Sequence, residues 1–122
     1  MANDKRRALR ADLLLGLVSL VGAVSASVAA APFVIYNETT NIQFVGVYLA
    51  PENTQYWGIN QALNDKDHVL DTSERLLLKD IEPRRYDVKL VDRNGRACIL
   101  KGIDLRQERS FEVRDQDLKD CR

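Results

Sequence analysis

Hydrophobic and polar residues alternate along much of this chain with the two-residue period of half-buried β-strands. The pattern is clearest in two runs, Tyr86–Val91 and Ala97–Ile103, which are separated by a turn containing Asn94-Gly95. Asn-Gly between two such runs is a strong hairpin signal, because both residues tolerate the positive φ of a tight turn. We therefore predict an antiparallel hairpin as the central element of the fold.

Two registers of this hairpin are compatible with the sequence. A two-residue loop pairs Leu90 with Ile99 and turns Lys101 toward the core. A three-residue loop, closed by a glycine in the left-handed conformation, pairs Leu90 with Cys98 and turns Leu100 toward the core. A slip of one residue moves every side chain to the other face of a strand. We predict the three-residue loop because it leaves the charged side chains together on the outer face, namely Asp87, Lys89 and Lys101.

Five further runs rich in β-forming residues predict additional short strands. These runs are Phe33–Tyr36, Ile42–Ala50, Val69–Leu70, Arg75–Ile81 and Ser110–Val113. Because Arg75–Ile81 contains three consecutive leucines and is flanked by turn residues, we expect it to be a buried strand. Asn60 is expected to cap one helical turn, and residues 115–120 are expected to form another near the C-terminus. Six or seven short strands without a long amphipathic helix favour an all-β fold, either a small antiparallel β-sandwich or a partly open barrel.

Two segments carry more local expectations. In the run from residue 42 to 50, Ile42, Phe44 and Tyr48 are expected on one face, while Gly46 interrupts the alternation and indicates a bulge or a close backbone approach. Asn37-Glu38-Thr39 has the form of a glycosylation sequon. We interpret it as a turn in which the Asn and Thr side chains cap backbone groups.

Residues 1–30 have the three-part order of a secretory signal peptide. Four basic residues precede an apolar run, Leu13–Val24, and a stretch of small residues follows. Cleavage between Ala30 and Ala31 would leave residues 31–122 as a single periplasmic or secreted domain that contacts the membrane only during export. The alternative is a retained anchor, because the uncharged stretch is 19 residues long and just sufficient to cross a bilayer.

The charge of the exported part argues against nucleic acid as a partner. Subtracting the four basic and two acidic residues of the first 30 positions from 18 of each leaves 14 Lys/Arg and 16 Asp/Glu. Both signs are scattered, and no basic stripe follows the chain. The remaining 92 residues can form only one modest core, and small exported domains of this size often carry a covalent crosslink.

The two cysteines provide such a crosslink. Cys98 lies in the second hairpin strand and Cys121 lies beside the C-terminus. In an oxidising compartment, two cysteines admit one connectivity, so we predict a disulfide that clamps the tail to the hairpin. A redox-active pair is the alternative, but it lacks the Cys-x-x-Cys spacing that tunes thiol pKa values.

Several short motifs follow one another in a recognisable order. They are Tyr36-Asn37-x-Thr39, Val47-Tyr48-Leu49-x-Pro51, Trp57-Gly58 followed by Leu63, Tyr86-Asp87-Val88-x-Leu90-Val91-Asp92 before a glycine turn, Cys98, and the ending Asp117-Leu118-x-x-Cys121. In this order the chain resembles a group of small exported bacterial proteins of no established function. The resemblance covers nearly all of residues 33–122 and implies no catalytic residues.

The sequence offers little catalytic chemistry. His68, the only histidine, lies in a polar segment, where a solvated side chain is the expected state. Two groups of carboxylates resemble metal ligands but lack the glycine and the distal glutamate of a calcium-binding EF-hand loop. They are Asp65, Asp67 and Asp71, and then Asp115, Asp117 and Asp120. We interpret the second group as acids that favour the start of a short helical turn. We expect no metal, no cofactor and no catalytic residue, although a pair of carboxylates brought together by the fold stays open.

Tyr56 and Trp57 are the candidate partner-binding residues. They lie in the longest irregular segment, Pro51–Asn64, where exposed aromatic side chains can anchor a partner or stack on a sugar. The alternative is that Trp57 covers one end of the sandwich. We predict a non-enzymatic exported β-domain that binds a protein or envelope partner. A small periplasmic hydrolase using an Asp/Glu pair and a secreted protein inhibitor with a rigid 51–64 loop are the alternatives.

Overall fold

The computed structural model describes residues 31–122, and the predicted signal peptide, residues 1–30, lies outside the described residues. Within the described part, the chain forms seven β-strands and no α-helix. The strands are β1 (Phe33–Asn37), β2 (Phe44–Pro51), β3 (Arg75–Leu78), β4 (Arg85–Asp92), β5 (Ala97–Asp104), β6 (Ser110–Val113) and β7 (Asp120–Cys121). Two short 3-10 turns, η2 (Gln61–Asn64) and η3 (Asp115–Asp117), complete the secondary structure. The predicted all-β fold with a short helical turn near the C-terminus is confirmed.

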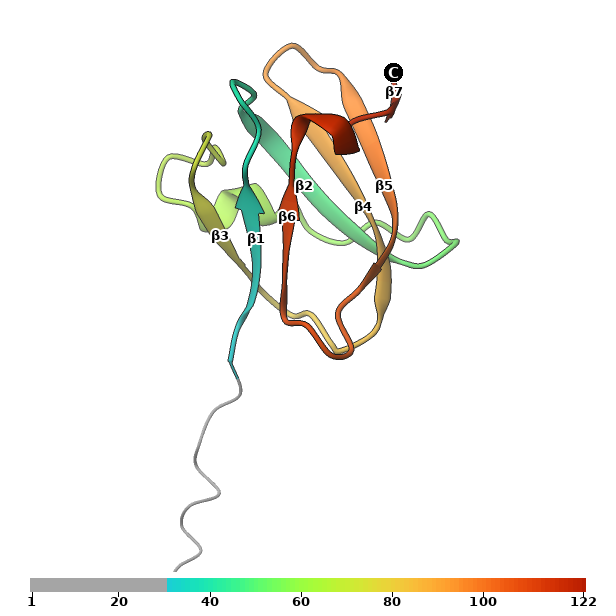
Figure 1. Ribbon diagram of the computed structural model, residues 1–122. Helices are drawn as coiled ribbons and strands as arrows, with labels where there is room; N and C mark the ends of the chain where they lie inside the picture. The colour runs from blue at the N-terminus through green and yellow to red at the C-terminus, as the bar shows by residue number, and fades with distance from the viewer. Residues whose placement is uncertain (1–30) are drawn as a thin grey trace, which may run out of the picture. The chain divides into compact units, whose positions relative to one another are not determined.

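The strands form two open sheets that face each other (Figure 1). One sheet has three strands in the order β3-β1-β6, and the other has four in the order β2-β4-β5-β7. All neighbouring strands are antiparallel except β1 and β6, which are parallel. The parallel pair arises because the chain crosses between the sheets after β5, so β6 reaches β1 running in the same direction.

A single hydrophobic core fills the space between the two sheets. Ile35 of β1 and Leu76 of β3 are buried against Phe44, Val88 and Leu90 of the four-stranded sheet. Burying apolar surface on both inner faces is the main source of stability for such a sandwich. The outer faces of the two sheets therefore remain available for other roles.

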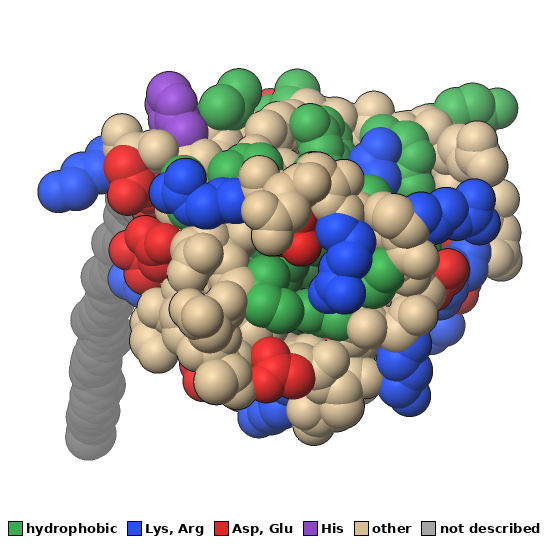
Figure 2. All heavy atoms as spheres, turned by 90° about the horizontal axis from the view of Figure 1, so that it is seen from above, with side chains coloured by type: hydrophobic (Ala, Val, Ile, Leu, Met, Phe, Trp, Pro, Cys, Tyr) green, Lys and Arg blue, Asp and Glu red, His purple; other side chains and the backbone are tan. Residues whose placement is uncertain are grey.

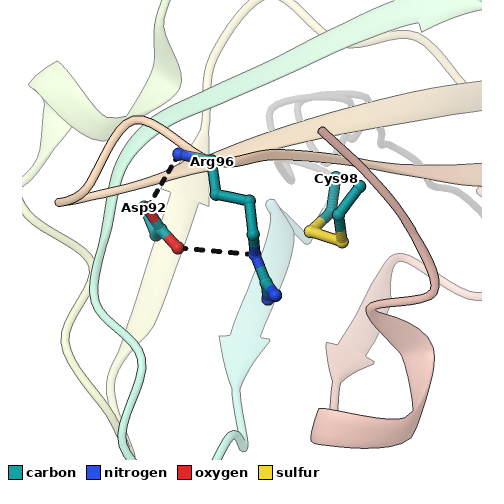
Figure 3. The surroundings of a disulfide bond; sticks show 4 residues. Asp92, Arg96 and Cys98 are labelled. Carbon is teal, nitrogen blue, oxygen red and sulfur yellow. Dashed lines mark hydrogen bonds and ion pairs between the residues drawn. A yellow bond between two sulfur atoms is a disulfide. The ribbon is translucent and has the colours of Figure 1, made fainter.

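The central hairpin adopts the predicted three-residue loop. Leu90 pairs with Cys98, the Asp92 N–H donates to the Arg96 carbonyl at 2.9 Å, and Gly95 has φ of +86°. The Asp92 carboxylate also accepts a hydrogen bond from the Arg96 N–H and pairs with its guanidinium (Figure 3). Leu100 is consequently buried in the core, as predicted.

The face assignment of Tyr48 was wrong because β2 contains a bulge. The register of β2 against β4 shifts between Phe44 and Gly46, so that the core residues after the shift are Val47 and Leu49. Tyr48 lies on the outer face. A Cβ atom added to Gly46 would lie 2.9 Å from the Tyr48 ring, so the glycine also permits a close approach, as its position indicated.

The predicted turns are formed by the polar side chains expected to form them. Asn60 caps η2, since its side-chain oxygen accepts a hydrogen bond from the Ala62 N–H at 3.0 Å. Asn37 is fully buried, and its oxygen accepts from the backbone and hydroxyl of Thr39. The interpretation of Asn37-Glu38-Thr39 as a capped turn is thus confirmed.

Two of the predicted strands are shorter than expected. Val69–Leu70 makes only an isolated bridge, between Leu70 and Phe44. The run Arg75–Ile81 ends as a strand at Leu78, and it is half-buried rather than buried, since Leu77 points outward with 46% of its surface exposed. The side chains of β3 alternate between solvent and core, because a strand of a two-layer sandwich packs only one face on the core.

The predicted disulfide joins Cys98 to Cys121 across neighbouring strands, with their Cα atoms 4.0 Å apart. The bond holds the two-residue β7 against β5, and Ala97 and Arg122 exchange two backbone hydrogen bonds at 2.9 Å beside it. No helix within residues 31–122 has the length and apolar character needed to span a membrane.

Removing the disulfide is expected to lower stability by about 3 kcal/mol while leaving the sheets formed, because a crosslink across 23 positions mainly restricts the unfolded chain. Urea denaturation of the oxidised protein and of a Cys98→Ala/Cys121→Ala variant measures the difference. The reductant dithiothreitol should lower the unfolding midpoint of the wild type but not that of the variant. Free alkylation of both cysteines in the native protein would contradict the crosslink.

Candidate binding groove on the four-stranded sheet

A groove with a volume of about 750 Å³ lies on the outer face of the four-stranded sheet. Its floor is formed by β4 and β5, one wall by residues 52–60, and the other by the chain around β7. We call residues 52–60 the groove loop. The lining side chains are Asn53, Thr54, Gln55 and Trp57 from the groove loop, Asp87, Lys89, Ala97, Ile99 and Lys101 from the floor, and Asp120 and Arg122 from the other wall.

Asp87 connects the groove loop to the floor. Its carboxylate, with 2% of the side chain exposed, accepts hydrogen bonds from the Lys101 ammonium at 2.7 Å, the Asn53 N–H at 2.9 Å and the Gly102 N–H at 3.1 Å. Gly102 donates from a bulge in β5 where its φ is +68°. Asp87 lies on the outer face with the two lysines, as predicted, but the sequence did not reveal that the groove loop buries it.

The environment of Asp87 favours its ionised form. Burial by itself raises the pKa of this carboxyl group, but the hydrogen bonds from Lys101 and from two backbone N–H groups outweigh burial and leave the pKa below its ordinary value. At neutral pH the groove therefore contains a buried carboxylate whose charge is already matched by a lysine.

The groove loop is held to the sheet by further hydrogen bonds along its length. At its start, the Glu52 carboxylate accepts two hydrogen bonds from the Arg85 guanidinium, at 2.8 and 3.0 Å. In the middle, the Gly58 N–H donates to the Leu49 carbonyl at 2.9 Å. At its end, the Asn60 side chain bonds the backbone of the bulged strand β2. The loop is thus a preformed wall.

Lys89 places its ammonium against two aromatic rings. The nitrogen lies 4.9 Å from the centre of the Tyr48 ring and 5.0 Å from that of Trp57. These distances are typical of cation–π contacts. Trp57 therefore folds back onto the outer face of the sheet, half-buried beside Lys89, and does not cover an end of the sandwich.

The two aromatic candidates have different environments. Trp57 lines the groove, whereas Tyr56 has 80% of its surface exposed and is not part of the lining. Two groove cations, Lys89 and Arg122, were missed as site residues from the sequence. Strand alternation placed Lys89 outward, but no local signal indicated that the loop and the C-terminal segment would enclose it.

Among the other candidate residues, Asp120 is the one that lines the groove. His68 is exposed in a turn with φ of +61°, and Figure 2 shows the histidine at the molecular surface. The Asp65 carboxylate accepts a hydrogen bond from the Asp67 N–H at 3.2 Å, and the interaction of the two side chains raises the pKa of Asp65 and lowers that of Asp67. Within residues 31–122, no group of three or more His, Cys, Asp or Glu side chains is placed to hold a metal ion.

The second acidic set is dispersed by the C-terminal turn. Asp117 caps η3 by accepting from the Arg114 N–H at 2.8 Å, and Asp115 accepts hydrogen bonds from Thr40 that lower its pKa. Asp120 is the exception, since it lines the groove. The expectation that these acids serve the start of a short helical turn is confirmed for Asp117.

Charges of both signs are interspersed with apolar side chains on the face shown in Figure 2. In the groove, the lining cations outnumber the lining anions by three to two. Lys101 is paired with Asp87, whereas Lys89 and Arg122 have no carboxylate partner among residues 31–122. Asp120, the second lining anion, likewise has no cationic partner among these residues, so the unpaired side-chain charges of the groove are two positive and one negative.

Comparison with protein-family models, with curated proteins and with solved structures found no match for this chain.

Acidification is expected to weaken the Asp87 contacts. Because the pKa of Asp87 is depressed in the folded state, its stabilising contribution is complete above the ordinary aspartate pKa of about 4 and is lost as the pH falls through the folded-state value. An Asp87→Asn variant should be less stable than the wild type at pH 7, and the difference should shrink toward pH 2. Urea denaturation of both proteins across this range measures the effect. A difference that is constant with pH would contradict it.

Proposed function

We propose that residues 31–122 act as an exported, non-enzymatic domain that binds an envelope partner through the groove. The observation that carries this proposal is the preformed groove-loop wall, in which Trp57 faces an open space above a sheet whose other face is filled by the core. A rigid wall with an aromatic side chain reduces the entropy lost on binding.

The chemistry of the groove supports binding rather than catalysis. A general acid or base must release or take a proton near the working pH. Asp87 instead has three hydrogen-bond donors and a depressed pKa, and neither His68 nor a cysteine thiol lines the groove. Asp120 also lines it, so the hydrolase alternative would have to rely on Asp87 and Asp120 as its acid pair.

An oxidising compartment outside the cytoplasm agrees with the disulfide. Small domains in such compartments commonly combine a modest core with a crosslink. The proposed location also agrees with the signal-peptide pattern of residues 1–30 and with the resemblance to small exported bacterial proteins.

A second candidate function, a secreted protein inhibitor, is favoured by one observation. The hydrogen-bonded groove loop presents Tyr56 with 80% of its surface exposed, and rigid loops with a protruding side chain are suited to blocking a cleft. Inhibition of an envelope hydrolase that is lost in Tyr56→Ala but kept in Trp57→Ala would favour this function over the groove.

The main proposal is tested by co-sedimentation of the purified, oxidised protein with an isolated envelope fraction. We expect the wild type to be retained and Trp57→Ala to be released. Leu77→Ser serves as the matched control, because Leu77 is an exposed apolar residue on β3, in the other sheet. Equal retention of the wild type and Trp57→Ala would contradict binding through the groove, and no retention of the wild type would contradict an envelope partner.

A further inference from the structure

We infer that the groove binds a carboxylate-bearing saccharide, with Lys89 and Arg122 holding the acid groups and Trp57 packing on a sugar ring. This inference rests on the proposed function and names the class of its ligand. It follows from three properties of the groove: two unpaired cations against one unpaired anion, a polar wall, and a position on the face of the sheet beside the covered strand β2.

The cations come from different parts of the groove. Lys89 projects from β4 in the floor, and Arg122 follows β7 in the wall that the disulfide holds in place. Neither has a carboxylate partner among the described residues, whereas Lys101 is neutralised by Asp87. A guanidinium and an ammonium at separate points suit a ligand that carries carboxylates along its length.

The groove loop supplies the uncharged polar contacts. Asn53, Thr54 and Gln55 line the groove beside Trp57, so amide and hydroxyl groups lie next to a flat apolar ring. This combination matches a sugar, which presents hydroxyl groups at its edge and C–H groups on its face. The groove volume of about 750 Å³ lies within the range of pockets that hold small molecules.

A peptide that adds a strand is disfavoured on the β2 side of the groove, because that edge of the sheet is already covered. Peptides that bind sheets commonly add a strand to a free edge through backbone hydrogen bonds. On one side of the sheet, β2 is covered by bonds from Gly58, Asn60 and Leu70. On the other side, β5 is covered at its start by β7, which is only two residues long. Because the groove lies on the outer face of the sheet and not along an edge, a ligand in it is held mainly by side chains.

The matched ligands for the test are tri-galacturonic acid and its fully methyl-esterified form, which keeps the rings and removes the charges. Calorimetry on the oxidised protein measures affinity, and fluorescence of Trp57, the only tryptophan, reports contact within the groove. We expect the acid to bind and the ester to bind at least about tenfold more weakly. Lys89→Gln and Arg122→Gln should each weaken binding of the acid by about tenfold or more, since each removes one charge-assisted hydrogen bond.

The control variant is Arg93→Gln, which removes an exposed cation of the β4–β5 turn and should leave the affinity unchanged. Circular dichroism confirms that each variant is folded. Equal binding of the acid and the ester would overturn the role of the carboxylates. Tighter binding of hexaglutamate than of tri-galacturonic acid would overturn the saccharide in favour of an acidic peptide. Failure of the acid to bind, with envelope retention still dependent on Trp57, would overturn this inference and leave the proposed function intact.

Discussion

Replacement of Asn37 by leucine is expected to lower the free energy of unfolding by about 3 kcal/mol or more, because each buried polar group left without a partner costs about 1–3 kcal/mol. The Asn37 side chain is fully buried and bonds four groups at once. Its amide donates to the carbonyls of Ile42 and Leu70 at 2.8 and 3.0 Å, and its oxygen accepts from the Thr39 N–H and hydroxyl at 3.0 and 2.7 Å.

The consequence extends across the fold because these partners belong to different segments. Asn37 ends β1, Ile42 precedes β2, and Leu70 bridges to Phe44. Leucine fills a similar volume, so the change removes the hydrogen bonds without a large cavity. Urea denaturation measures the loss. Asn41→Leu, at an exposed position of the same turn, is the matched control and should stay within about 0.5 kcal/mol of the wild type. A loss of only about 0.5 kcal/mol for Asn37→Leu would contradict the role assigned to Asn37.

Shortening Leu100 to alanine is expected to cost about 2–5 kcal/mol, whereas the same change at the neighbouring Ile99 should cost below about 1 kcal/mol. Leu100 is buried in the core opposite Val88. Ile99 lies on the other face of β5, half-buried in the floor of the groove. The removed carbon atoms therefore leave a cavity in the first case and a wider groove in the second.

The Leu100 and Ile99 variants test the register of the hairpin directly. Both substitutions remove three side-chain carbon atoms from adjacent positions of one strand, so each serves as the control for the other. Urea denaturation with unchanged slopes gives the two free-energy differences. A costly Ile99→Ala together with a nearly neutral Leu100→Ala would mean that the hairpin has a two-residue loop and that Cys98 faces outward.

The candidate site was predictable only in part. The aromatic residues of the irregular segment drew attention to Trp57, and strand alternation placed Asp87 and Lys89 on the outer face. What alternation cannot give is which loop covers that face. Asp87 is separated by 34 positions from Asn53, whose N–H donates to it, and such a contact leaves no local pattern. The bulge at Gly46, which turned Tyr48 outward toward Lys89, was indicated only as an irregularity.

Local chemistry determined the all-β class, the capped turns at Asn37 and Asn60, the three-residue hairpin loop and the pairing of the two cysteines. Each depends on side-chain periodicity, on the backbone preferences of neighbouring residues or, for the cysteines, on a count that allows one pairing. The tertiary structure alone decided the parallel pairing of β6 with β1, the burial of Asp87 and the groove between Trp57 and Arg122. These features arise when segments far apart in the chain pack together, and their energies depend on distances that a linear pattern does not contain.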